Sequence, residues 1–135
     1  MRHKVDGRLF GRPANQRRAL LRGLVTALFE NQRIETTVAK AKETKRIAEK
    51  MVTFGIKGDL HSKRQVLSYV TDRAVASKLF NEIAPRFSGR NGGYLRIVQT
   101  RNRLKDSAPM AVLEFIDYES VKVAKGKAKK EEQAK

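Results

Sequence analysis

Few side chains in this sequence are suited to catalysis. The 135 residues include no cysteine and only two histidines, His3 and His61. Without cysteine the chain has no thiolate nucleophile and no sulfur ligand for zinc, and neither histidine has a companion ligand at metal-binding spacing. Carboxylates such as Glu30, Glu82 and Glu114 are scattered singly along the chain. Because no set of nucleophile, base and orienting group is visible, we expect no catalytic residue, no metal ion and no cofactor.

Basic side chains dominate instead, and the chemistry they offer is the binding of anions. The chain has 30 Lys and Arg against 14 Asp and Glu, which gives a formal net charge of +16. A folded body with this surplus repels itself, so the charge favours a polyanionic partner. Nucleic acid is the first candidate, and an anionic membrane surface or an acidic protein comes second. A membrane span is not expected, because the longest apolar run, Met110–Leu113, falls far short of the roughly twenty residues required.

The basic residues are concentrated in two arginine-rich segments. Residues 1–18 carry six bases and one acid, and residues 86–105 carry six bases and no acid. Arginine has a planar guanidinium that grips phosphate with two hydrogen bonds, whereas lysine is a hydrated point charge. Residues 119–135 contain only lysine as base, together with three Glu. We therefore interpret the arginine-rich segments as phosphate contacts and the Lys/Glu/Ala-rich tail as a solvated, flexible end.

A glycine-rich loop lies inside the second arginine-rich segment. The stretch Ser88–Gly93 lacks the G-x-G-x-x-G spacing of nucleotide-binding loops and precedes a strand rather than a helix. Two interpretations remain open. The glycines could supply positive φ angles for a turn, or they could thin the backbone so that Arg86, Arg90 and Arg96 press against a phosphodiester chain.

Three aromatic residues lie within the arginine-rich segments: Phe10, Phe87 and Tyr94. Stacking on nucleic-acid bases and local packing are equally consistent with their positions. The other four phenylalanines fall on apolar stripes or at element ends and are predicted to be core residues: Phe29, Phe54, Phe80 and Phe115.

Hydrophobic residues at helical spacing predict four helices. The expected ranges are residues 16–32, 37–56, 60–70 and 73–84. Asn15, Thr36 or Thr37, and Asp72 are the expected N-caps, and Pro85 is expected to end the last helix. In the third helix the residues predicted to face the core are Leu60, Val66, Leu67 and Val70.

Three short β-favouring runs complete the pattern. Residues 34–36 predict a short edge strand, and Tyr94–Thr100 and Met110–Tyr118 predict an antiparallel hairpin. We expect a compact α+β domain over residues 15–118, in which a short three-stranded mixed or antiparallel sheet packs against about four helices. An extended basic arm, residues 1–14, precedes this domain, and the tail 119–135 follows it.

Several sequence blocks occur in the order found in a known family. They are Met1–Lys4 with Gly7-Arg8, Arg17-x-Ala19-Leu20-x-x-Gly23-Leu24, Arg33–Thr37, Ala39–Glu43, Gly58–His61, Lys78–Phe80, Ile83–Arg86, Gly92-Gly-Tyr94-x-Arg96-Ile97 and Ala108–Ala111. Through these blocks, from Met1 to about Tyr118, the chain resembles bacterial large-subunit ribosomal protein seventeen. One block departs from the family, which commonly has Ser-Ser-His-Arg where this chain has Ala14-Asn-Gln-Arg17, so a histidine contact is not carried over to Gln16.

The resemblance implies a structural protein of the large ribosomal subunit in the cytoplasm, present as a monomer in each ribosome. It implies binding to large-subunit ribosomal RNA and a place near the peptide tunnel exit, beside neighbouring ribosomal proteins, where the protein would support subunit assembly and translation. No small-molecule substrate and no membrane are expected. Taken with the charge pattern, the candidate RNA-binding residues are Arg2, His3, Lys4, Arg8, Arg12, Arg17, Arg18, Arg22, Lys40, Lys42, Arg86, Arg90, Gly92, Gly93, Tyr94 and Arg96.

Charge and composition alone leave a second nucleic-acid partner open. A DNA-compacting architectural protein also needs a basic surface and no active site. Competition between duplex DNA and large ribosomal RNA at fixed salt concentration separates these two hypotheses. An enzyme acting on RNA is a third hypothesis, but it requires a polar constellation that the sequence does not display.

Overall fold

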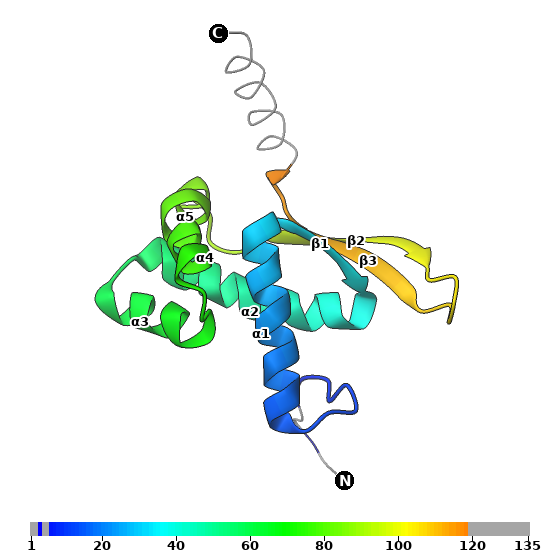
Figure 1. The fold of residues 1–135 in the computed structure, drawn as a ribbon. Helices are drawn as coiled ribbons and strands as arrows, with labels where there is room; N and C mark the ends of the chain where they lie inside the picture. Colours follow the sequence, from blue (N-terminus) through cyan, green and yellow to red (C-terminus); the bar gives the residue numbers. More distant parts are fainter. Residues whose placement is uncertain (1–2, 4–5, 119–135) are drawn as a thin grey trace, which may run out of the picture.

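The computed structural model describes residue 3 and residues 6–118, and it places helices on one face of a small sheet (Figure 1). The elements follow the predicted order. They are α1 (Ala14–Asn31), β1 (Arg33–Thr37), α2 (Val38–Lys57), α3 (Leu60–Tyr69), α4 (Arg73–Lys78), η1 (Leu79–Ile83), α5 (Ala84–Arg86), β2 (Leu95–Asn102) and β3 (Pro109–Phe115). The predicted α+β class is confirmed. The arm and tail boundaries at residues 14 and 118 stay a prediction, and residues 119–135 lie outside the described residues.

The sheet has the strand order β1-β3-β2, and both pairings are antiparallel. The predicted edge strand and hairpin are therefore confirmed, and β3 occupies the centre. Leu95 pairs with Phe115, and Leu113 pairs with both Ile97 and Ile34. Because side chains alternate along a strand, these five residues share the face that packs on the helices.

The core forms where α2 meets the sheet and the other helices. This helix contacts α1, α3, η1, α5 and all three strands, and Figure 1 shows α1 crossing it. The largest fully buried apolar side chains come from every layer: Val25, Leu28, Phe29, Val52, Val66, Val70, Leu79, Ile83, Leu113 and Phe115. This shared core fixes the relative positions of the elements that carry the basic segments.

The predicted cap of α1 at Asn15 is wrong. Asn15 lies inside the helix, and its Oδ1 accepts a hydrogen bond from the adjacent Gln16 N–H (2.8 Å). Pro13 is the N-cap residue instead, and its carbonyl accepts the Arg17 N–H (2.9 Å). Proline suits the start of a helix because its φ is already fixed and its missing N–H would have no intrahelical partner there. At the other end Gln32 takes a left-handed conformation and donates its N–H to the Leu28 carbonyl.

Pro85 does not end the last helical segment, which continues through Arg86. The chain widens first into the π-helical turn η1, where the N–H of Ala84 reaches back five residues to the carbonyl of Leu79. A proline in an α-helix clashes with the carbonyl four residues earlier and lacks its own donor. The wider turn accommodates the ring, so α4, η1 and α5 form one continuous segment. The Asp72 cap is confirmed, because its carboxylate accepts the N–H groups of Ala74 and Val75.

The predicted core face of α3 is half wrong. Val66 and Val70 are fully buried, whereas Leu60 is 65% exposed and Leu67 is 47% exposed. The ten-residue helix turns Ser62 and Val66 toward α2, and Ser62 is itself buried. Leu60 and Leu67 are seven residues apart and so lie on one face of the helix. This face points away from α2 and into solvent.

Candidate nucleic-acid interface

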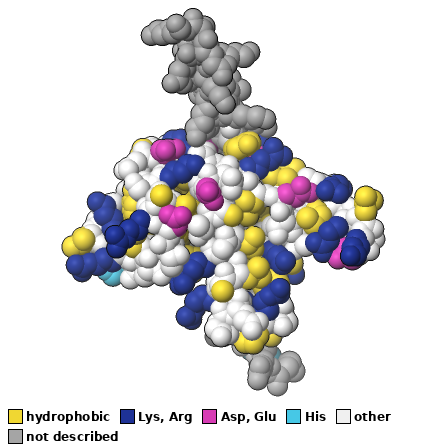
Figure 2. All heavy atoms as spheres, viewed as in Figure 1, with side chains coloured by type: hydrophobic (Ala, Val, Ile, Leu, Met, Phe, Trp, Pro, Cys, Tyr) yellow, Lys and Arg dark blue, Asp and Glu magenta, His cyan; other side chains and the backbone are white. Residues whose placement is uncertain are grey.

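Four arginines around the start of α1 form the most open basic surface among the predicted site residues. We call Arg8, Arg12, Arg17 and Arg18 the arm–α1 cluster. Arg12 donates from Nη1 to the Phe10 carbonyl (2.8 Å), and Arg12 and Arg18 are exposed. Within the described part of the chain, Arg12, Arg17 and Arg18 make no ion pair with any acid. Figure 2 shows basic side chains around this half of α1. Three guanidinium groups in one place without counter-charges suit phosphate binding.

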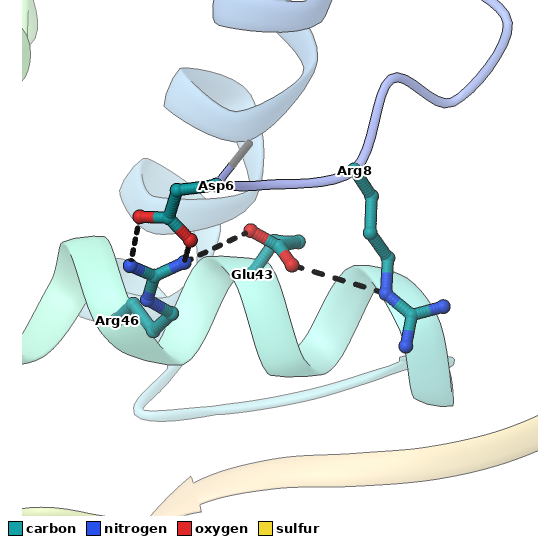
Figure 3. A network of polar contacts seen from close by, with 4 residues as sticks. All are labelled: Asp6, Arg8, Glu43 and Arg46. Atoms are coloured by element: carbon teal, nitrogen blue, oxygen red, sulfur yellow. Dashed lines mark hydrogen bonds and ion pairs between the residues drawn. The ribbon is translucent and has the colours of Figure 1, made fainter. Parts of the chain in front are cut away.

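Two ion pairs attach the arm to α2 (Figure 3). Arg46 binds the Asp6 carboxylate through both terminal nitrogens, with a distance of 2.6 Å from Nη1 to Oδ1. Glu43 then approaches Arg46 Nη1 (3.7 Å) and Arg8 Nε (3.8 Å). The hydrogen bonds from Arg46 lower the pKa of Asp6, and they raise the pKa of Arg46 in turn. These contacts hold residues 6–8 beside α2.

The described arm is turned rather than extended, which corrects the expected shape. Gly7, Phe10 and Gly11 all have positive φ angles, at 86°, 53° and 60°. A tight turn between Leu9 and Arg12 is closed by the Arg12 N–H donating to the Leu9 carbonyl (3.1 Å). Positive φ is the conformation that glycine adopts most easily. The turn brings the arm back to the start of α1.

Lys40 and Lys42 extend the same side of the molecule. Both precede Glu43, the residue that Arg8 approaches, within the first two turns of α2. Lys42 is exposed and Lys40 is partly buried. His3 and Gln16 are exposed as well, whereas Arg2 and Lys4 lie outside the described residues.

Arg22 has a packing role that the sequence pattern did not show. Its Nη2 donates to the Ser68 carbonyl of α3 (3.4 Å), and its guanidinium carbon lies 5.5 Å from the centre of the Tyr69 ring. Burial raises the pKa of the Tyr69 hydroxyl. Arg22 therefore ties α1 to α3, which leaves fewer of its N–H groups available to bind a ligand.

The glycine-rich loop after α5 is held by its own residues. Arg90 donates from Nε to the Gly92 carbonyl (3.0 Å), and the Tyr94 hydroxyl donates to the Arg90 carbonyl (3.1 Å). Gly92 and Gly93 have φ angles of 120° and 63°. Of the two interpretations of these glycines, the turn is confirmed. The exposed guanidinium of Arg90 stands at its surface.

Tyr94 is a core residue, so of the two interpretations left open for its position the structure supports local packing. It is only 3% exposed, and Phe87 beside it is 4% exposed. Their ring centres lie 5.4 Å apart, and Phe87 also lies 5.7 Å from Phe115. Side chains buried in an aromatic cluster cannot stack on a nucleic-acid base, so local packing decides both positions.

Arg86 and Arg96 are joined to acids that hold the fold together. Arg86 donates from Nη1 to Gln32 Oε1 (3.1 Å), and its Nε lies 3.2 Å from Asp117 Oδ2. Arg96 donates from Nε to Glu114 Oε1 (2.7 Å) on the open face of the sheet. Glu114 has only 6% of its side chain exposed, and it also approaches Arg33 Nε (3.3 Å). The side chains of Arg86 and Arg96 are therefore already engaged in contacts between elements of the protein.

The predicted site residues therefore separate into two groups at opposite ends of α1. The arm–α1 cluster surrounds its first turns, whereas Arg86 binds Gln32 at its C-cap. A helix of 18 residues is about 27 Å long at 1.5 Å per residue. The arm and the glycine-rich loop are thus separate surfaces on one rigid body.

A third basic region around α3 was missed. Lys63, Arg64 and Arg73 are exposed there, and Figure 2 shows basic side chains gathered at that end of the molecule. The pattern that could have revealed it is the spacing of Leu60, Lys63, Arg64 and Leu67 on one helical face. Assigning the two leucines to the core concealed this face.

The described residues include neither a metal site nor a membrane-spanning helix. No group of three or more histidine or acidic side chains comes close enough there to hold a metal ion. No helix in that part of the chain is both long and apolar enough to cross a membrane.

Comparison with known proteins gives one consistent result. The family model described as ribosomal protein L17 matches residues 20–116. The large ribosomal subunit protein bL17 of Thermodesulfovibrio yellowstonii is 66% identical over 87% of this chain and 89% of its own length. The bL17 proteins of Desulfotalea psychrophila and Geobacter metallireducens are 52% and 49% identical, over 92% and 96% of this chain and 96% and 72% of their own lengths.

Proposed function

Because this chain belongs to the ribosomal protein L17 family, we propose that it binds large-subunit ribosomal RNA through the arm–α1 cluster, near the exit of the peptide tunnel. Membership makes the chain a structural constituent of the large ribosomal subunit in the cytoplasm, and not an enzyme. The place near the tunnel exit and the neighbouring ribosomal proteins follow from the family resemblance of its sequence blocks. The contacts to RNA are argued from the arginines themselves.

One observation carries the RNA-binding surface. Arg12, Arg17 and Arg18 gather at one end of α1 and have no acidic partner among the described residues, whereas Arg33, Arg86 and Arg96 are all paired with buried or half-buried acids. An arginine already engaged with a carboxylate has less to gain from a phosphate. The unpaired arginines can neutralise phosphates and release their counterions, which is the main source of affinity for nucleic acid.

The arrangement favours recognition of RNA shape and backbone over base sequence. The aromatic rings Phe87 and Tyr94 are buried, so the glycine-rich loop offers the Arg90 guanidinium rather than stacking surfaces. Proteins that read structured RNA by shape rely on contacts to phosphates and sugars. The glycine-rich loop provides a second, smaller contact at the other end of α1.

The test is a triple substitution with a matched control. Arg12→Ala, Arg17→Ala and Arg18→Ala together should lower affinity for purified large-subunit ribosomal RNA at least about tenfold, and should reduce the slope of log affinity against log salt by roughly 2. Filter binding over a range of salt concentrations measures both quantities. The control is Lys63→Ala, Arg64→Ala and Arg73→Ala, which removes the same charge from exposed positions on α3 and α4.

The control variant distinguishes RNA binding through a defined surface from nonspecific electrostatic attraction by the net charge of the protein. Equal losses of affinity for the two triple variants would overturn the proposed surface, because net charge alone would then explain binding. Duplex DNA as competitor at fixed salt addresses the DNA-compacting alternative. Ribosomal RNA should displace the protein from DNA, and the reverse order of preference would contradict a ribosomal role.

A further inference from the structure

The outward face of α3 alternates apolar and basic side chains. Leu60, Lys63, Arg64 and Leu67 follow the i, i+3, i+4, i+7 spacing that places residues on one side of a helix. Leu60 is 65% exposed and Leu67 is 47% exposed, so this side faces away from the core. A helix that serves only as a solvated surface has no need of leucines there, although single exposed apolar residues are common.

Leu67 also lines a groove between α3 and the following helical segment. The groove has a volume of about 400 Å³ and is lined by Lys63, Leu67, Arg73, Ala76, Ser77 and Phe80. Leu67, Ala76 and Phe80 give it an apolar surface, and Lys63 and Arg73 contribute one positive charge from each side. An open groove of this size and lining can accept an apolar side chain from another molecule.

The positive charges beside the groove are not neutralised by nearby acids. Asp59 and Asp72, which precede α3 and α4, cap those helices: Asp59 accepts the Ser62 N–H (3.3 Å) and Asp72 accepts the Ala74 N–H (2.8 Å). Lys63, Arg64 and Arg73 form no ion pair with any residue of the described chain. A ligand for this surface should therefore bring its own carboxylates.

RNA would satisfy the charges but not the apolar surface. A phosphate backbone gains nothing from Leu60, Leu67 or the groove, and it would leave their apolar area either in water or against charged oxygens. A protein segment can cover both at once. Protein interfaces typically have an apolar centre inside a polar rim.

We propose that the α3–α4 groove docks an acidic segment of another protein of the large subunit. One aliphatic or aromatic side chain of that segment enters the groove beside Leu67, and carboxylates on either side face Lys63, Arg64 and Arg73. This surface is separate from the arm–α1 cluster. The inference takes from the proposed function only that the chain assembles into the large subunit, and it needs none of the proposed RNA contacts.

The first experiment replaces Leu67 with the photo-crosslinking residue p-benzoylphenylalanine in the full-length chain. After assembly into large subunits and purification of these subunits, irradiation should join position 67 to one protein segment, identified by mass spectrometry. That segment should carry an apolar residue flanked by at least two Asp or Glu. The matched control places the same residue at Leu104, which is 95% exposed in the connection between β2 and β3, and it should not label that segment.

The second experiment measures the contribution of charge. A synthetic peptide with the sequence of the crosslinked segment should bind the wild-type chain, and Lys63→Glu with Arg73→Glu should weaken binding at least about tenfold, because like charges then face each other. A peptide whose acids are exchanged for lysine should regain affinity for this variant and lose it for the wild type. Circular dichroism confirms that the variant is folded, as expected for two exposed positions.

Four outcomes would overturn the inference. They are crosslinks from position 67 to ribosomal RNA, no crosslink at all, a segment without carboxylates, and a peptide whose affinity ignores the charge reversal. Each is distinguishable from failure of the proposed function, which is measured by the RNA affinity of the Arg12, Arg17 and Arg18 variant. Docking at the groove can succeed or fail independently of that result.

Discussion

Arginine serves two purposes in this chain, and the partners of each side chain separate them. Arg22, Arg86 and Arg96 bind groups on neighbouring elements. The first ties α1 to α3, the second ties α5 to the C-cap of α1, and the third ties β2 to β3. Arg12 and Arg18 stand exposed at the start of α1. Removing an arginine of the first kind leaves a half-buried acid or amide unsatisfied, which destabilises the fold. Removing one of the second kind should affect only what the surface binds.

Arg103 also binds an acid, but one in its own connection between β2 and β3 rather than on a neighbouring element. It binds Asp106 through Nε (2.8 Å) and Nη2 (2.6 Å), and Asp106 also accepts the Ala108 N–H (3.3 Å). The Arg103 hydrogen bond is the main cause that lowers the pKa of Asp106 to about 2. The pair closes the turn between β2 and β3.

The pH dependence of this turn follows from the direction of that shift. Because the folded pKa lies below the ordinary value of 3.8, the pair stabilises the folded turn fully above about pH 4, and this contribution is lost as pH falls through about 2. NMR titration of the Asp106 carboxyl carbon should give a midpoint near 2. Arg103→Ala should move the midpoint toward 3.8, whereas the control Arg101→Ala should leave it in place; equal effects would contradict the assignment to Arg103.

At the scale of elements, two helical glycines differ in the space around them. A side-chain carbon added at Gly23 in α1 meets nothing within 4 Å, whereas one at Gly55 in α2 would lie 3.1 Å from the Ala84 Cβ and 3.5 Å from the Leu79 Cγ. Gly55 therefore permits the close approach of α2 to the segment η1–α5. Within the described chain no neighbouring atom requires a glycine at position 23.

Alanine substitution of both glycines tests this packing. Gly23→Ala should stabilise the protein by about 0.5–1 kcal/mol, because alanine favours the helix more than glycine does. Gly55→Ala gains the same preference but overpacks the contact with Ala84, at a cost of about 1–3 kcal/mol, so it should be destabilising overall. Urea unfolding of both variants measures the difference. An equal gain in stability at the two positions would show that η1 and α5 move aside freely.

Most elements could be predicted from the sequence because local patterns determine them. Alternation in β2 and β3 gave the correct faces for Leu95, Ile97 and Leu113, and Asp72 was correctly identified as a cap. The errors arise where tertiary context decides. The orientation of Leu60 and Leu67 depends on which face of α3 meets α2, and the π turn before Pro85 depends on packing that no local pattern encodes.

At the scale of the whole molecule, the sequence identified the basic segments but not their distribution in space. Residues 1–18 and 86–105 stand out in the sequence by their arginines. The pairing of Arg86 with Asp117 and of Arg96 with Glu114, however, depends on strand register and on the helix ends. The burial of Tyr94 likewise depends on Phe87 and Phe115 meeting it in the core. Sequence spacing alone cannot give contacts of this kind.

The separation of the two surfaces has a measurable effect on RNA binding. Arg18 lies about 21 Å along α1 from Gln32, the C-cap residue that Arg86 binds, and Arg90 is in the loop that follows Arg86. Sites this far apart contribute independently. The losses in RNA-binding free energy for Arg18→Ala and Arg90→Ala should therefore add, within about 0.5 kcal/mol, in the double variant. Filter binding of the four proteins measures this, and strong coupling would indicate that the two ends do not engage RNA as parts of one rigid body.

Because β3 lies at the centre of the sheet, the sheet cannot form until this strand has been synthesised. Among the described residues both β1 and β2 pair with this strand, which is the last strand there, so the ion pair between Arg33 and Glu114 forms only after β3 has been synthesised. While translation is in progress, the two earlier strands have unpaired backbone groups. A chain that stops before Pro109 therefore has no sheet at all. Such a product should be readily recognised by chaperones and proteases.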